Sequence, residues 1–378
     1  MRVAVAIAII IVLIMSNSNS DKSKCVKLYK KCGYKKLKYR KMKKIFIYEH
    51  KNKYGNAIQE LDKIIQAGPN ELDLCYKHKG RLLIKMGDFF GASACYEKAL
   101  TISPNDKKLI ENIDMVNYNI ANKLINEGKA KEAVDFLLDV LHHDEGRSTV
   151  NTLNNLSWAY NTIRDYEHAL EYSNYGLEKN AKDCFLLTNK GNALFGLGRN
   201  EEALVEYDKV ISLAPDYSSG WYGKGISNYC LKNYEEAEKA FRRYLEIKKD
   251  PDKDAYYYIS ECLYNQRKFK EEIEFFDALI AKNNRDPWYY NSKANTFCCL
   301  NKFHKAIECF DRVIELNANY ATAYYSKCRI FCKFNILDGA LDMLKKAVEI
   351  DKKYIDIAKG DEGINNIKRF KQYEDIIA

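Results

Sequence analysis

Histidine and cysteine are the residues of this chain that could hold a metal ion or act as nucleophiles. Two thiol pairs lie close in sequence: Cys298 adjoins Cys299 near His304, and Cys328 precedes Cys332 by four residues. Thiolate and imidazole both bind zinc. However, the 12 cysteines show no CxxC spacing, and the 6 histidines are scattered along the chain. We therefore interpret the cysteines as small apolar residues of helices and expect no metal site.

Catalytic motifs are equally weak. The sequence shows no HExxH, no nucleophile elbow and no Ser/His/Asp order. Residues 191–196 and 223–225 resemble phosphate loops only superficially, because both stretches follow no strand and fall within expected helices. The pair His142-His143 ends an expected helix, where cationic residues are favourable. The sequence thus predicts no enzyme activity, no catalytic residue and no cofactor.

The positive charge of the chain is concentrated at its start. Among 378 residues the net charge is +9, but residues 1–44 alone carry 13 Lys/Arg and one Asp, which is +12. The rest of the chain therefore carries −3, too little for a basic groove, so we expect no nucleic-acid partner. Hydrophobic residues make up 47% and prolines number only 5, which indicates an ordered protein.

The first residues form a separate segment. Residues 3–15 are an unbroken apolar run, about 20 Å long as a helix, which is shorter than a bilayer core of about 30 Å. We interpret residues 1–20 as a signal-like or anchor segment and residues 21–37 as a basic linker. Lysine-rich flanks resist translocation, so a membrane contact through residues 1–44 would keep the rest in the cytoplasm. Secretion through a signal peptide, or a start at Met42, stays an open alternative, and the oligomeric state is not predicted.

A repeat of about 34 residues organises the rest of the chain. Its clearest copy has Gly191, Leu194, Ala203 and Tyr207 and ends at Pro215. The small residue at the position of Ala203 recurs with spacings of 34 to 36 residues and one of 41. The residues that occupy this position in successive copies are Ala57, Ala92, Ala133, Ala169, Ala203, Ala237, Glu272, Ala306 and Ala340. A period of 34 residues with two helices per unit is typical of tetratricopeptide repeats.

On these residues the chain resembles the tetratricopeptide repeat family over about residues 38–354. The resemblance implies an all-α, right-handed superhelix of about nine helix-turn-helix repeats, and we expect residues 355–378 to form a C-terminal capping helix. The expected repeats are 38–71, 73–106, 114–147, 150–183, 184–217, 218–251, 253–286, 287–320 and 321–354. Two departures stand out: Glu272 occupies a small-residue position, and residues 107–113 are extra and should extend the first helix of the third repeat.

The packing logic of the repeat follows from side-chain size. Two antiparallel helices approach closely only where side chains are small, so Gly191 and Ala203 should mark their crossing, with Tyr207 and Leu194 filling the space around it. The prolines agree with this register, since all five fall at repeat junctions, where a missing N–H does least harm.

The family resemblance implies that the first helices of the repeats together line a concave groove. Asparagines recur at equivalent groove positions, and their amides can pair with an extended peptide backbone. This row is similar to the asparagine ladders of protein O-glycosyltransferases, although general asparagine richness explains it equally well. The predicted groove residues are Asn119, Asn122, Asn155, Asn189, Asn192, Asn291 and Asn295, with Tyr222 and Tyr257 as amphipathic anchors.

A second family mode is a clamp of cations and asparagines that grips the C-terminal tail of a chaperone. Lys77 and Arg81 lead here to Asn119, but Asn151 and Asn155 stand where further cations are needed, so the clamp is incomplete. We predict a non-catalytic scaffold or adaptor that binds a peptide or helix of another protein. The alternatives are an accessory subunit that delivers substrate to an enzyme on another chain, and a membrane-tethered assembly platform.

Overall fold

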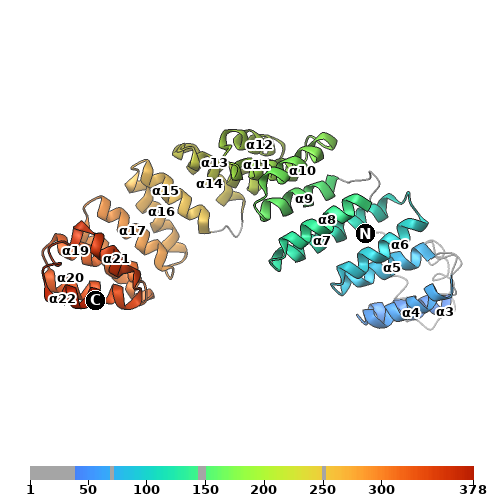
Figure 1. The fold of residues 1–378 in the computed structure, drawn as a ribbon, viewed down its shortest axis with the longest axis horizontal. Helices are drawn as coiled ribbons and strands as arrows, with labels where there is room; N and C mark the ends of the chain where they lie inside the picture. Colours follow the sequence, from blue (N-terminus) through green and yellow to red (C-terminus); the bar gives the residue numbers. More distant parts are fainter. Residues whose placement is uncertain (1–38, 69–71, 144–149, 249–252) are drawn as a thin grey trace. The chain divides into compact units, whose positions relative to one another are not determined.

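The computed structural model describes residues 39–68, 72–143, 150–248 and 253–378. Throughout these ranges the chain is built from helices and contains no strand, which confirms the all-α class (Figure 1). The expected segments 1–20 and 21–37 lie outside the described residues. None of the described helices is long and apolar enough to cross a membrane.

The chain divides into two compact units, residues 1–213 and 214–378. The helices of the first unit are α3 (Tyr39–His50), α4 (Tyr54–Gln66), α5 (Leu72–Lys85), α6 (Phe89–Ile102), α7 (Lys107–Asn126), α8 (Ala130–His143), α9 (Val150–Thr162), α10 (Tyr166–Lys179), α11 (Cys184–Gly196) and α12 (Asn200–Leu213). Those of the second are α13 (Ser218–Cys230), α14 (Tyr234–Ile247), α15 (Lys253–Asn265), α16 (Phe269–Lys282), α17 (Pro287–Cys299), α18 (Phe303–Leu316), α19 (Ala321–Lys333), α20 (Leu337–Ile350), α21 (Lys353–Gly360), the 3₁₀ turn η1 (Glu362–Ile364) and α22 (Lys371–Ile377).

Every helix pair from α3–α4 to α19–α20 turns in the same way. One residue between the two helices adopts a positive φ, between 54° and 78°. These residues are Asn52, Gly87, Gly128, Arg164, Gly198, Lys232, Arg267, Asn301 and Asn335. The next residue donates its N–H to a carbonyl five residues earlier, for example Arg199 N to Leu194 O at 2.9 Å, which is how a left-handed residue ends a helix. Nine such turns in the described ranges show that one unit of structure repeats along the chain.

Glycine and an aromatic ring meet inside several pairs, as the size argument predicts. A Cβ on Gly191 would lie 2.7 Å from the Tyr207 ring, and a Cβ on Gly80 would lie 2.5 Å from the Tyr96 ring. Ala203 is fully buried beside Tyr207 and Leu194. The crossing point of the two helices is therefore set by residues without side-chain bulk.

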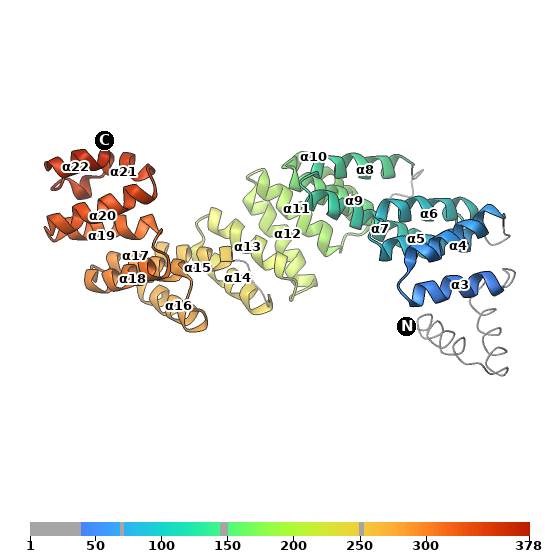
Figure 2. The same cartoon turned by 90° about the horizontal axis from the view of Figure 1, so that it is seen from below.

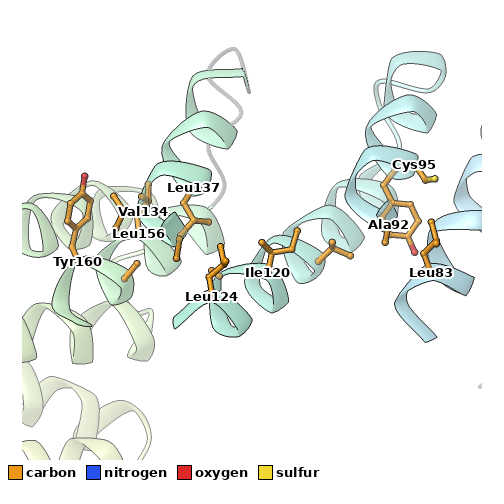
Figure 3. Close-up of a cluster of buried hydrophobic side chains, with 14 of the residues drawn as sticks. Leu83, Ala92, Cys95, Ile120, Leu124, Val134, Leu137, Leu156 and Tyr160 are labelled. Atoms are coloured by element: carbon orange, nitrogen blue, oxygen red, sulfur yellow. The ribbon is translucent and has the colours of Figure 1, made fainter. Parts of the chain in front are cut away.

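The core is continuous from one pair to the next between α5–α6 and α9–α10. A cluster of buried apolar side chains runs from Leu83 in α5 through Ile120 in α7 and Leu137 in α8 to Tyr160 in α9 (Figure 3). The seven extra residues before the third repeat begin α7 at Lys107, and Leu109 among them is buried in this cluster. Stacking of neighbouring pairs thus buries what a single pair would expose.

The end of the chain differs from the single capping helix expected over residues 355–378. Three short elements replace it, α21, η1 and α22. Gly360 ends α21, and the Asp361 side chain caps η1 by accepting from the Gly363 N–H at 2.8 Å. Ile364, Ile367 and Tyr373 are buried against α19 and α20, so the segment still covers the last pair.

Candidate peptide-binding face

Three first helices lie side by side in the first unit: α9 contacts α7 on one side and α11 on the other (Figure 2). Equivalent positions of these helices form one surface, which we call the first-helix face. Its residues are Met115, Tyr118, Asn119 and Asn122 of α7, Asn151, Asn154 and Trp158 of α9, and Phe185 and Asn192 of α11. They recur at i, i+3 and i+4 spacing, so on each helix they make a single stripe.

Large apolar side chains are exposed on this face. Phe185 is 58% exposed, Met115 49% and Tyr118 46%. The Tyr118 ring lies against the half-buried Trp158 ring, with centroids 6.2 Å apart and planes inclined by 30°. Burying such side chains against a partner is worth about 1.5–3 kcal/mol each. The face therefore has the composition of an interaction surface rather than of a solvated one.

The amides predicted to line the groove are partly accessible. Asn119 and Asn122 of α7 are half-buried and hold local hydrogen bonds, with Asn119 Nδ2 donating to Met115 O at 2.8 Å. Asn192 is exposed, and its Oδ1 accepts from the buried Tyr207 hydroxyl at 2.7 Å. This bond orients the Asn192 amide so that its NH₂ group faces away from the tyrosine oxygen.

Two other members of the predicted row lie inside the stack instead. Asn155 is 2% exposed and Asn189 7% exposed. Asn189 Nδ2 donates to Asn154 O at 3.2 Å and to Asn154 Oδ1 at 2.9 Å, while Asn161 Nδ2 donates to Asn189 O at 3.0 Å. These bonds join α9 to α11, so Asn189 stabilises the stack in this structure.

The predicted residues of the second unit differ in how accessible they are. Asn291 is buried, and Tyr222 packs between Phe241 and Tyr244, with ring centroids 5.7 Å and 5.1 Å away. Asn295 is exposed and lines a pocket, whereas Tyr257, 45% exposed, is on α15.

The two cations that begin the incomplete clamp are held by carboxylates of the chain itself. Lys77 Nζ lies 2.7 Å from Asp106 and 3.0 Å from Asp73. Arg81 Nη2 lies 3.3 Å from Glu49. Burial alone would raise the pKa of Glu49, but hydrogen bonds with His78 and Lys85 and the Arg81 charge lower it to about 2. Glu49 is therefore ionised at neutral pH and compensates Arg81 and Lys85.

Metal-binding clusters are absent from the described residues, where no group of three or more His, Cys, Asp or Glu side chains could hold an ion. Cys328 and Cys332 are buried in α19 and packed in the core of the last pair. The side chains of His142 and His143 lie outside the described residues.

Sequence reasoning did not single out the aromatic pair of the first-helix face. Tyr118 occupies the same repeat position as Tyr222 and Tyr257, and Trp158 occupies that of Asn122 and Asn192. The signal was therefore present in the repeat register, but only the contact between α7 and α9 shows that the two rings meet.

Family models match four stretches of the chain. One tetratricopeptide repeat model matches residues 188–252 and 246–287, and a second matches residues 75–106 and 289–320. A Triticum aestivum relative called Hsp70-Hsp90 organizing protein is 26% identical over 217 residues, covering 54% of this chain and 34% of the relative. A tetratricopeptide repeat-containing protein of Methanocaldococcus jannaschii is 24% identical over 266 residues, covering 63% of this chain and 45% of the relative. The chain thus spans less than half the length of either relative.

A solved structure shares the fold. The C-terminal part of a tetratricopeptide repeat-containing protein from Cytophaga hutchinsonii aligns with a TM-score of 0.54 and 15% identity, covering 63% of this chain and 98% of that one. The helical fold of this chain, its recurring left-handed turn and the four matched stretches all indicate the same type of repeat. The chain contains tetratricopeptide repeats over residues 75–106, 188–287 and 289–320.

Proposed function

We propose that this chain is a non-catalytic scaffold or adaptor that binds an extended peptide or a helix of another protein on its first-helix face. The observation that carries the proposal is the contact between the exposed Tyr118 ring and the half-buried Trp158 ring, placed between accessible amides on three adjacent helices. Tyrosine and tryptophan supply much of the binding energy of protein interfaces because they combine large area with few rotatable bonds.

The amides around the pair would give a bound backbone its register. A peptide buries N–H and C=O groups when it docks, and each unpaired group costs about 1–3 kcal/mol. Asn122 and Asn192 can each donate and accept, so they can satisfy such groups whatever the peptide side chains are. The aromatic pair would supply affinity, and the amides would limit the cost of desolvation.

The names of the relatives make Hsp70 and Hsp90 the first partners to test. A clamp for a tail carboxylate at Lys77 and Arg81 is not favoured, because Asp73, Asp106 and Glu49 already compensate both cations. Binding to a chaperone would instead use the first-helix face. Apart from Cys75, the nine cysteines of the described ranges form no disulfide, which fits a reducing compartment, so we propose a cytoplasmic role.

The experiment is affinity capture from native lysate with the full chain. It compares a double variant, which carries both Tyr118→Ala and Trp158→Ala, with the single variant Tyr175→Ala. Tyr175 is a matched control, because it is 46% exposed like Tyr118 but lies on the second helix α10. We expect the double variant to retain about a tenth or less of the captured partners, since central aromatic residues dominate interface energies.

The control variant should capture the same proteins as the unchanged chain. Equal capture by all three chains would contradict the proposal. Co-purification of a single catalytic subunit, lost in the double variant, would assign the chain instead to the accessory role in substrate delivery.

A further inference from the structure

A pocket of about 530 Å³ opens in the second unit between α17, α19 and η1. Asn295 from α17 and Ser326, Arg329 and Lys333 from α19 supply its polar groups. Phe303 and Ile330 form an apolar part of the pocket wall. All of these elements belong to residues 214–378, so the pocket is complete within one unit.

The charge of the pocket is positive and only partly compensated. Arg329 is 59% exposed in its side chain, and its Nε lies 3.1 Å from Asp361 Oδ2. That same oxygen also accepts from the Tyr325 hydroxyl at 2.7 Å. A guanidinium has five N–H donors, so one shared carboxylate oxygen leaves most of them available to a ligand. No Asp or Glu is among the described residues that line the pocket.

Lys333 provides the second cation. Its Nζ lies 4.3 Å from the centroid of the Phe303 ring and donates to Asn301 Oδ1 at 3.5 Å. An ammonium held over an aromatic face without a carboxylate keeps its attraction for an anion. Arg329 and Lys333 are four residues apart on α19, so both project from the same side of that helix.

The walls are apolar where they meet these cations. Burial raises the pKa of the Cys298 thiol to about 11, so this lining residue is neutral at physiological pH. Ile330 is 4% exposed, and the Phe303 ring packs edge-on against Phe334, with centroids 5.4 Å apart. A charged ligand group would therefore lie beside an apolar one.

A second pocket in the same unit provides a contrast. It is about 490 Å³ in volume and lies among α16, α17 and α18. Its cations are interleaved with Glu274, Asp277 and Glu308, and Lys293 pairs with Asp277. Three carboxylates thus face four lysines, which compensates most of the positive charge of this pocket and lowers its preference for an anion.

We propose that the pocket between α17, α19 and η1 binds the carboxylate of a glutamate or aspartate side chain in an extended segment of a partner protein. Arg329 and Lys333 hold the carboxylate, Asn295 and Ser326 hydrogen-bond the adjacent backbone, and Phe303 packs against an apolar neighbour of the acidic residue. This site deepens the proposed function and rests on it, because it gives the peptide ligand a required acidic residue.

The test is fluorescence polarisation on the full chain with two labelled octapeptides, both blocked at their ends. One alternates leucine with glutamate, and the other alternates leucine with glutamine. We expect the glutamate peptide to bind about tenfold more tightly, because charge-assisted hydrogen bonds are about twice as strong as neutral ones. Raising the salt concentration should reduce the difference.

Two variants and a matched control locate the site. Lys333→Met and Arg329→Gln should each weaken the glutamate peptide about fivefold to tenfold and leave the glutamine peptide unchanged. Arg312→Gln removes the same charge from α18, where Arg312 pairs with Glu315, and should change neither affinity. Arg329 also holds Asp361, so Lys333→Met keeps the test valid if Arg329→Gln loosens the chain end.

Equal affinity for the two peptides, no binding of the glutamate peptide up to about 1 mM, or unchanged binding by both variants would overturn the proposal. A phosphoserine peptide that competes about tenfold better than the glutamate peptide would also overturn it, by making phosphate the ligand. Failure of the proposed function has a different signature, because it is read from partner capture by Tyr118 and Trp158 variants of the other unit.

Discussion

Gly191 shows how closely one residue can determine the geometry of a repeat. Adding a Cβ there would bring it 2.7 Å from the Tyr207 ring, whose hydroxyl is fixed by Asn192. We predict that Gly191→Ala destabilises the chain by about 1–3 kcal/mol, because the ring must move in a filled core. Gly55→Ala is the matched control, since nothing lies within 4 Å of a Cβ at this position in α4.

Urea unfolding followed by circular dichroism measures both variants. The control should be neutral or more stable by up to about 1 kcal/mol, because alanine is the better helix former. An unchanged midpoint for Gly191→Ala would show that the glycine is not needed for the approach of α11 and α12, and the packing account of the repeat would fail there.

The element that departs most from the repeat pattern is the pair α15 and α16. Glu272 stands at the small-residue position, is 3% exposed, and accepts a hydrogen bond from the Ser260 hydroxyl at 2.7 Å. The other carboxylate oxygen is buried as well. The two helices also contact each other less extensively than the pairs on either side. A buried carboxylate, rather than an error of register, thus separates this pair.

The ionisation of Glu272 makes this pair sensitive to pH. Burial raises the pKa of Glu272 above its ordinary value of 4.5, and the Ser260 hydrogen bond opposes the shift only in part. A carboxyl with a raised folded pKa costs nothing below its unfolded pKa and destabilises the fold as pH rises through the folded value. We predict that Glu272→Gln stabilises the chain by about 1 kcal/mol at about pH 8, and by almost nothing at about pH 4.

Melting temperatures at the two pH values check this prediction. Glu271→Gln is the control, because Glu271 is the exposed neighbour in the same first turn of α16 and should give no such pH-dependent gain. A Glu272→Gln variant that is less stable than the unchanged chain at the higher pH would contradict the electrostatic explanation.

The sequence predicted the elements well, because each repeat carries its own packing code. Small and large residues such as Ala203 and Tyr207 recur at fixed positions, and their contact is local to one pair. The structure of the terminal segment was harder to predict. Gly360 and Gly363 fit a single helix poorly, but their positions do not indicate how many elements replace that helix. Two short helices and a 3₁₀ turn cover the last pair instead.

The candidate site was less predictable from position alone. Asn119, Asn155 and Asn189 share one position in their repeats, yet only Asn119 is half-accessible. The burial of such a side chain depends on how closely the first helix of the next repeat approaches. That approach is a contact between repeats, so the position within one repeat does not determine it. The same holds for Trp158 and for Lys333, whose partners belong to other helices.

We propose that the two units of the molecule recognise different features of a partner. The first unit offers aromatic rings and amides on α7, α9 and α11. The second offers a basic pocket on α17 and α19. Because each site is complete within its own unit, each can be altered without changing the other. The division predicts that variants of the aromatic pair and of Lys333 act independently on binding, as sites that share no residues do.

The central claim is that a partner protein contacts the first-helix face, and site-specific photo-crosslinking tests it most directly. A benzophenone amino acid replaces Tyr118 in one chain and Tyr175 in another, and each chain is irradiated in native lysate. We predict partner adducts from position 118 and none of the same partners from position 175, since the two side chains are equally exposed at 46% but lie on different helices. Adducts of the same partners at equal yield from both positions, or from position 175 alone, would contradict it.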